Sequence, residues 1–210
     1  MITTVYLLRH SEPFKVHRGI EIIDDDFLTI NKKTPLSVDG EHLAEGISQN
    51  SEFENIDIIW ASDYVRTMST AKYIAFKNNL KVNINKDLGE RIHGVDKVSE
   101  IPSDFEIRQF TDENYKLLNG ESRKEVSQRL YRCLINIIND NKGKKIVIVG
   151  HSTATAYLLS NWCEISYDSN YKFKGKTFFD GKWNYCQTFK LKFENNELTS
   201  IEDIKVNSKI

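Results

Sequence analysis

Short apolar runs that alternate with helical patterns constrain the fold of this chain more than any other feature. The clearest run is KIVIVG at residues 145–150, and similar runs are TVYLL at 4–8 and IDIIWA at 56–61. Each is too short for a buried helix and rich in strand-forming residues, so each predicts a buried strand. Strands that alternate with helices favour a mostly parallel sheet covered by helices on both faces. We therefore expect an α/β fold.

Helix signals follow several of these runs. Ser37 is a candidate N-cap for a helix that extends to Gln49, and residues 62–63 open a helix with an approximate apolar face. Residues 121–122 begin a long helix with apolar residues three and four apart, and residues 151–156 begin another.

The remaining segments are less regular. Residues 81–85 alternate as a strand does, and residues 186–193, a turn at 195–197 and the apolar residues after it predict a C-terminal hairpin. Residues 13–36 predict a long loop or small insertion, and residues 86–120 show no clear pattern.

Length and charge narrow the class of protein. The 210 residues suit one domain over 1–210, and a net charge of −1 provides no broad basic surface for nucleic acid. The N-terminus lacks the pattern of a signal peptide, and no run approaches the roughly 20 apolar residues of a membrane span. We expect a cytoplasmic protein with no membrane partner. Cys133, Cys163 and Cys186 form no CxxC pair, which disfavours a disulfide or a metal site.

Charged and basic side chains occur where the predicted strands end. Arg9 and His10 follow the first strand, Arg66 lies in the first turn after the second, and His151 follows the fourth. Glu90 comes after the third predicted strand, followed by Arg91. Ligands of open α/β sheets bind beyond the carboxyl ends of the strands. Each of these residues taken alone could be structural or solvated, but together they predict one pocket.

The chemistry of this set suits an anion. Arg9 and Arg66 offer forked donors for phosphate or carboxylate, and the helix beginning near Ser152 adds free N–H groups. A histidine can act as donor or nucleophile, and a carboxylic acid can protonate a leaving oxygen. Phosphoryl transfer depends on positioning and charge stabilisation, which these residue types supply without a metal.

Six segments resemble motifs of the histidine phosphatase superfamily, which includes the cofactor-dependent phosphoglycerate mutases. They occur in the family's order and span roughly residues 3–160; they are LLRHSE (7–12), PLSVDGE (35–41), ASDYVRTMSTA (61–71), LGERIHG (88–94), GES (120–122) and IVGHS (148–152). The resemblance implies a three-layer α/β/α sandwich that uses no metal, so no cofactor is expected.

The resemblance also implies roles for individual residues. His10 corresponds to the nucleophile that carries a phosphohistidine, and Arg9, Arg66 and His151 correspond to the phosphate-binding group, with His151 also counted as catalytic. Glu90 corresponds to the proton donor. In another branch the donor is an Asp directly after the second histidine, and here that position is Ser152.

Several positions depart from the family pattern. Ser11 and Ser152 replace frequent glycines, Pro13 replaces Thr or Ser, and no Trp-Glu-Gly follows Gly94. The stretch between Pro13 and Pro35 is also longer than usual, and we expect these changes to alter substrate contacts.

Other polar side chains each allow two interpretations. Arg18 is either a substrate contact or a solvated arginine, and His93 either acts directly or is close to Glu90 in sequence only. Residues 24–26 form either a cation site or a solvated acidic loop.

These residues leave three functions open. A phosphatase acting on a small phosphorylated substrate is the leading hypothesis, and a phosphoglycerate mutase-type phosphotransferase is the alternative. Mutases of this family are usually longer, whereas this chain is short between Glu90 and Gly120. A phospholigand-binding module without turnover is the third, although His10, Glu90 and His151 are all present. Sugar phosphates, nucleotides, phosphoproteins and cofactor precursors are all consistent as substrates, and the oligomeric state stays open.

Overall fold

A six-stranded sheet forms the centre of the computed structural model, which describes residues 1–15, 26–167 and 169–206. Within these residues the strand order is β3-β2-β4-β1-β8-β9. The strands are β1 (Ile2–Arg9), β2 (Ile58–Ala61), β3 (Val82–Ile84), β4 (Lys145–Gly150), β8 (Thr188–Glu194) and β9 (Glu197–Ile204).

Strands β1 to β4 are parallel, and β8 and β9 form the antiparallel edge. The hairpin turn contains Asn195 and Asn196, both with positive φ (49° and 67°), as a tight type I′ hairpin requires. The predictions of a mostly parallel sheet and of a C-terminal hairpin are confirmed.

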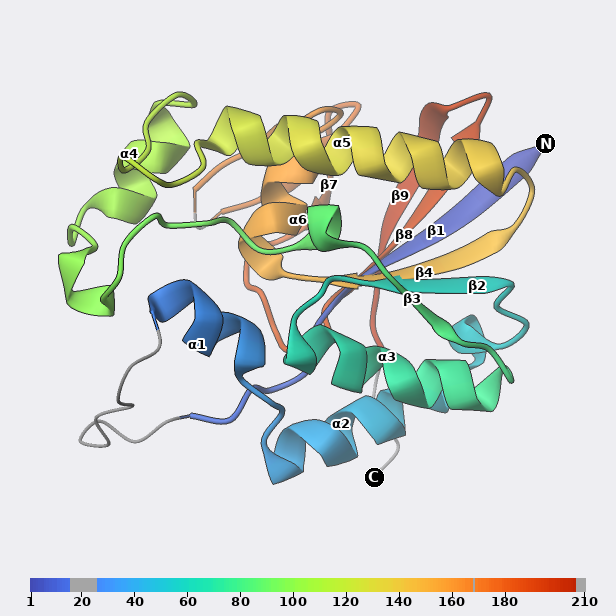
Figure 1. Cartoon of the computed structure of the whole chain (residues 1–210). Helices are drawn as coiled ribbons and strands as arrows, with labels where there is room; N and C mark the ends of the chain where they lie inside the picture. Colours follow the sequence, from blue (N-terminus) through green and yellow to red (C-terminus); the bar gives the residue numbers. More distant parts are fainter. Residues whose placement is uncertain (16–25, 168, 207–210) are drawn as a thin grey trace.

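Helices cover both faces of this sheet, which gives three layers (Figure 1). Val5 and Leu7 of β1 pack in the core with α5 and α6, whereas Tyr6 and Leu8 pack on the opposite face with α2 and α3. The alternation arises because successive side chains of a strand point to opposite faces. The described helices are α1 (Phe27–Lys33), α2 (Val38–Ser48), α3 (Val65–Lys77), α4 (Phe105–Thr111), α5 (Arg123–Asp140) and α6 (Ser152–Leu159).

Local capping explains where two helices begin. The Ser37 hydroxyl accepts a hydrogen bond from Gly40 N at 2.9 Å, as predicted for the N-cap of α2. Ser122 and Glu125 form a capping box at the start of α5. The helix expected to open at residues 62–63 instead begins at Val65, with Tyr64 as its N-cap in an extended conformation.

The two ends of the segment 13–36 meet at one point of the fold. Pro13 and Leu36 form an isolated bridge, and Phe14 N donates to Pro35 O at 2.8 Å. The segment was expected to be a loop or small insertion, and it contains α1, whose N-cap is Asp26. Arg18, Asp24 and Asp25 lie outside the described residues.

Residues 86–120, which showed no clear pattern, and residues 164–179, for which no element was predicted, both contain short elements. Residues 86–120 hold two 3₁₀ turns, Lys86–Leu88 and Val98–Glu100, and the helix α4. A second sheet is built from β5 (Glu164–Ile165), β6 (Tyr171–Phe173) and β7 (Lys176–Phe179). These elements are too short for a periodic signal.

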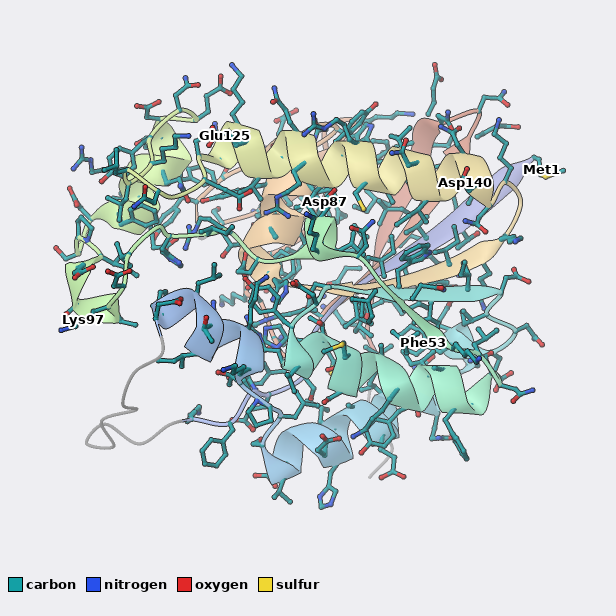
Figure 2. The ribbon with its side chains drawn as sticks, viewed as in Figure 1. Met1, Phe53, Asp87, Lys97, Glu125 and Asp140 are labelled. Carbon is teal, nitrogen blue, oxygen red and sulfur yellow. The ribbon has the colours of Figure 1, made fainter. Side chains whose placement is uncertain are left out.

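The two ends of the molecule carry different parts of the chain. Glu125 at the start of α5 lies toward the same end as Lys97, whereas Asp140 and Met1 lie at the opposite end (Figure 2). The parallel strands run away from Met1, so their carboxyl ends face the end that carries α1 and α4 (Figure 1). None of the helices in the described ranges has the length and apolar character to cross a membrane.

Candidate active site

The sheet register brings the two predicted histidines together. Arg9 is paired with Gly150 across the parallel strands β1 and β4, so the next residue of each strand is a histidine. The rings of His10 and His151 meet edge to face with their centroids 5.4 Å apart. Both side chains are buried, His151 completely. The expected convergence at the strand ends is therefore present.

His10 is held as a neutral imidazole of defined tautomer. Its Nδ1 lies 2.7 Å from the carbonyl oxygen of Ser11. A carbonyl only accepts hydrogen bonds, so Nδ1 carries the proton and Nε2 carries the lone pair. Burial, together with the positive charge of Arg66, lowers the pKa of His10 to about 3. A neutral imidazole with its Nε2 lone pair available is the form that can attack phosphorus.

Ser11 connects the segment after β1 to α2 and α3 through two hydrogen bonds. Its hydroxyl donates to Gly40 O at 2.7 Å, and its N–H donates to Thr70 Oγ1 at 2.9 Å. The residue is fully buried. The expectation that Ser11 alters substrate contacts is therefore wrong, because its hydroxyl is used inside the protein. Gly40 permits this close approach, since a Cβ there would lie 2.1 Å from Glu12 O.

His151 takes part in a chain of hydrogen bonds in which the donor and acceptor atoms of its ring can be assigned. Arg66 Nη2 lies 3.3 Å from His151 Nδ1, and because a guanidinium only donates, Nδ1 accepts. The proton is then on Nε2, which lies 2.9 Å from Ser62 Oγ. Ser62 in turn contacts Thr67 Oγ1 at 2.8 Å, and Thr67 donates to Tyr64 O. Burial and then Arg66 lower the pKa of His151 well below its usual value, so its ring is neutral.

Arg66 links the central sheet to the segment 13–36. Its guanidinium donates through Nη1 to the backbone carbonyl of Asn31 in α1 and stacks over the Tyr64 ring at 4.7 Å. Lys32 of the same helix forms a 2.7 Å ion pair with Asp63. Helix α1 therefore forms one wall of the site and contacts Arg66, one of the cations of the site.

Arg9 provides the second cation. Its Nη1 donates to Trp183 O at 3.0 Å, and its guanidinium lies 4.9 Å from the centre of the Tyr185 ring. Its Nε is buried and finds no partner among the described residues, which leaves a donor for an anion. Burial lowers the pKa of Arg9 and Arg66, and the nearby negative charge of Glu90 partly offsets this effect at both.

Glu90 is attached to the start of α6. Its Oε1 accepts hydrogen bonds from Arg91 N and Ala154 N, both at 2.9 Å. Both donors bind one oxygen, so Oε2 is the oxygen that can carry a transferable proton. The contact with Ala154 N holds the carboxyl group at the first turn of α6, which follows His151, and its charge acts on Arg9 and Arg66.

Arg129 is a site-building residue that the sequence analysis missed. It forms a two-point ion pair with Glu121 (2.7 and 2.8 Å) and donates to Asp87 O at 2.8 Å and to Gly89 O at 3.2 Å. Glu121 also accepts from Ile92 N at 3.1 Å. The pair thus fixes the backbone on both sides of Glu90, beneath α5, where Figure 2 labels Asp87. The motif GES contains Glu121, but nothing in the sequence paired it with an arginine on the next helix.

Arg91 does not join the other arginines. Its guanidinium forms a two-point ion pair with Glu106 (2.7 and 2.9 Å) and donates to Gln109 Oε1 and to His93 Nε2. His93 is half-buried, and burial together with Arg91 lowers its pKa to about 4. Both side chains therefore support α4. In the described ranges no group of three His, Cys, Asp or Glu side chains is arranged to hold a metal ion.

Comparison with known proteins places this geometry in a family. The model of the histidine phosphatase superfamily (branch 1) matches residues 5–197. A relative from Salmonella paratyphi A, named "probable phosphoglycerate mutase GpmB", is 29% identical over 164 residues, which cover 74% of this chain and 73% of that protein.

Solved structures share the fold. A mycobacterial glucosyl-3-phosphoglycerate phosphatase superposes with a TM-score of 0.67 at 16% identity, covering 91% of both chains. A phosphoserine phosphatase from Entamoeba histolytica, solved as a mutant with phosphoserine, has a TM-score of 0.66 at 18% identity and covers 99% of this chain and 100% of that one. At such identities the similarity concerns the fold alone.

Proposed function

The chain belongs to branch 1 of the histidine phosphatase superfamily, and on that premise we propose that it is a phosphatase of small phosphomonoesters that works through a phosphohistidine on His10. The observation that carries the proposal is the state of His10. A neutral ring with its lone pair on Nε2 lies near the buried guanidinium group of Arg66 and the partly exposed guanidinium group of Arg9. Structural neighbours named as phosphatases support the proposed reaction class.

The first proposed step transfers the phosphoryl group to the enzyme. His10 Nε2 attacks phosphorus, an N–P bond forms, and the P–O bond to the alcohol breaks. Glu90 gives a proton from Oε2 to the departing oxygen, so an alcohol leaves instead of an alkoxide. Arg9 and Arg66 bind the non-bridging oxygens, whose charge the guanidinium groups stabilise during the transfer. His151 accepts a hydrogen bond from Arg66 through Nδ1 and so orients this guanidinium toward the phosphoryl group.

The second step regenerates His10. Water attacks the phosphohistidine, Glu90 now accepts its proton, and the N–P bond breaks to release inorganic phosphate. Glu90 is then protonated again for the next substrate. The hydrogen bond from His10 Nδ1 to Ser11 O keeps the ring aligned in both steps.

A mutase is the second candidate, because the Salmonella relative bears that name. A mutase would return the phosphoryl group to a second hydroxyl, and must keep water away from the phosphohistidine. Given 3-phosphoglycerate and a bisphosphoglycerate primer, we expect phosphate release to exceed isomerisation. Rapid isomerisation with little free phosphate would instead establish the mutase.

Trapping of the intermediate tests the proposal directly. Wild-type protein quenched during turnover of a ³²P-labelled substrate should carry an acid-labile, base-stable phosphate, and His10→Ala should lose both label and turnover. His42→Ala, at an exposed histidine of α2, is the matched control. Turnover should persist in EDTA and be inhibited by vanadate. A His10→Ala protein with near wild-type turnover would exclude the assignment, and full loss in EDTA restored by a divalent ion would exclude the metal-free mechanism.

A further inference from the structure

A cavity of about 180 Å³ opens at the start of α6, the helix that follows His151. Its walls come from three separate regions: Phe110 at the end of α4, Tyr167 and Tyr171 near the small sheet, and Trp183 before β8. Ser152 and Thr153 of α6 complete it. We call it the aromatic pocket.

The aromatic pocket adjoins the phosphate-binding groups on two sides. Ser152 and Thr153 directly follow His151, and the next residue, Ala154, donates its N–H to Glu90. On the other side, Arg9 donates to the backbone carbonyl of Trp183. A phosphoryl group at His10 would therefore have its ester oxygen near Glu90 and its alcohol portion directed along the start of α6.

The walls are built to contact a flat group. Phe110 and Tyr167 meet edge to face with centroids 5.4 Å apart, and Trp183 packs edge to face against Phe179 at 5.4 Å and Phe189 at 5.3 Å. Aromatic faces and edges bind rings through dispersion and burial of apolar area. The hydroxyl groups of Ser152 and Thr153 can form hydrogen bonds with a polar atom on such a ring.

The charge of the pocket argues against a second anionic group. None of the described lining residues is a lysine, arginine or histidine. Among these described lining residues Glu106 is the one that carries a charge, and Arg91 already forms a 2.7 Å ion pair with it. A carboxylate on the substrate, as in phosphoglycerate, would enter without a counter-charge and would lie near Glu106, which is unfavourable.

The volume limits the size of the occupant. Pockets for drug-sized ligands usually measure roughly 300–1,000 Å³. A cavity of about 180 Å³ suits a single ring with a short linker.

We infer that the aromatic pocket binds the alcohol portion of the substrate, and that this portion is an uncharged group bearing one ring. The inference rests on the proposed phosphatase function. It assigns the substrate class to phosphomonoesters of ring-bearing neutral alcohols, and it disfavours phosphoglycerate.

Three substrates with similar alkoxide leaving groups test the inference: 2-phenylethyl phosphate, propyl phosphate and 3-phosphoglycerate. The expected order of kcat/KM in the wild-type protein follows that sequence. Partial burial of a phenyl ring should give 2-phenylethyl phosphate an advantage of about 10-fold over propyl phosphate.

Variants locate the preference. Tyr167→Ala removes a side chain that is 43% exposed, so the fold should be retained, and the ratio of kcat/KM between the ring and propyl substrates should fall toward one. Phe110→Ala, which removes the ring that packs against Tyr167, should lower the same ratio. Tyr131→Ala, at a similarly exposed tyrosine on α5, should leave the ratio unchanged.

Each outcome has one meaning. Equal kcat/KM for the ring and propyl substrates, a preference for 3-phosphoglycerate, or an unchanged ratio in both pocket variants overturns the inference while leaving the phosphatase function intact. No phosphate release from any of the three substrates would count against the phosphatase function itself.

Discussion

The floor and the walls of this site are built in different ways. The floor, formed by Arg9, His10, Arg66 and His151, sits on the ends of β1 and β4 and the start of α3, and three of these side chains are at most 6% exposed. The walls come from α1, α4 and the small sheet, which are short and lie outside the central layers (Figure 1). A rigid floor suits chemistry that tolerates little displacement, whereas short peripheral elements can vary without disturbing it.

The floor and the walls also differ in the burial of the interactions that hold them in place. The floor is supported by buried hydrogen bonds, such as those that Ser11, the residue after His10, donates to Gly40 O and Thr70 Oγ1. A wall element such as α1 is held partly by the partly exposed pair of Lys32 and Asp63, and its described residues include no buried side chain. Exposed ion pairs contribute little stability, so changes in the walls should alter substrate choice more than turnover.

The largest expected effect concerns Glu90, which joins floor and wall. Glu90→Gln retains the shape but cannot transfer a proton, so the first phosphoryl transfer from an alkyl phosphate should slow by roughly 10²–10⁴-fold. The loss with p-nitrophenyl phosphate should be clearly smaller, because p-nitrophenolate leaves without a proton. Single-turnover rates are the measurement, since Glu90 also acts in the second step. An equal loss for both leaving groups would mean that Glu90 only positions the phosphate or the arginines.

A smaller effect is expected at Arg129, which positions Glu90 without reaching the substrate. Arg129→Lys keeps the charge but loses the fork that binds Glu121 and the carbonyls of Asp87 and Gly89, so kcat should fall by roughly 10-fold to 100-fold. The loss should be greater for an alkyl phosphate than for p-nitrophenyl phosphate, as for Glu90. Arg132→Lys, at an exposed position of the same helix, is the control. A rise in KM alone, equal for both substrates, would contradict a role through Glu90.

The burial of the floor should also appear in stability. The pKa of His10 is about 3 in the folded protein, whereas a free histidine has a pKa of about 6.5. Between these values the unfolded chain binds a proton that the native His10 does not, so the free energy of unfolding should fall as the pH is lowered through this range. His10→Asn should reduce that slope by up to about 1.4 kcal/mol per pH unit.

Urea unfolding at several pH values between about 6.5 and 4.5 measures this slope. His42→Asn is the control for loss of one histidine, because it removes an exposed side chain of α2. Parallel stability curves for wild type and His10→Asn would show that His10 is protonated in the native state.

The smallest effect is expected in the wall. Lys32→Ala breaks an ion pair whose side chains are 37% and 30% exposed, so the free energy of unfolding should fall by about 0.5 kcal/mol. Turnover should change by no more than about 2-fold, as expected for a loss of that size. Thermal or urea unfolding with a parallel activity assay measures both. A loss of turnover as large as that of Arg129→Lys would mean that α1 belongs to the floor.

Much of the floor could be predicted from the sequence. The run at 145–150 became β4 with the same bounds, and the residues after the strands met because parallel neighbours end at one edge of a sheet. Ser37 and Ser122 marked helix starts through their own hydrogen bonds to nearby backbone. These signals are local, since strand periodicity and capping depend on residues close together in the chain.

The walls and the supports could not be predicted in this way. Three side-chain interactions join residues whose proximity no local sequence pattern encodes. They are the hydrogen bond from Arg66 to Asn31 O in α1 and the ion pairs of Arg129 with Glu121 and of Arg91 with Glu106. The aromatic pocket likewise combines side chains from α4, the small sheet and the segment before β8. The sequence by itself determined which chemical groups stand at the strand ends. The tertiary structure decided their tautomers, their supports and the shape of the cavity beside them, because hydrogen bonds, burial and packing depend on distances that only the folded chain sets.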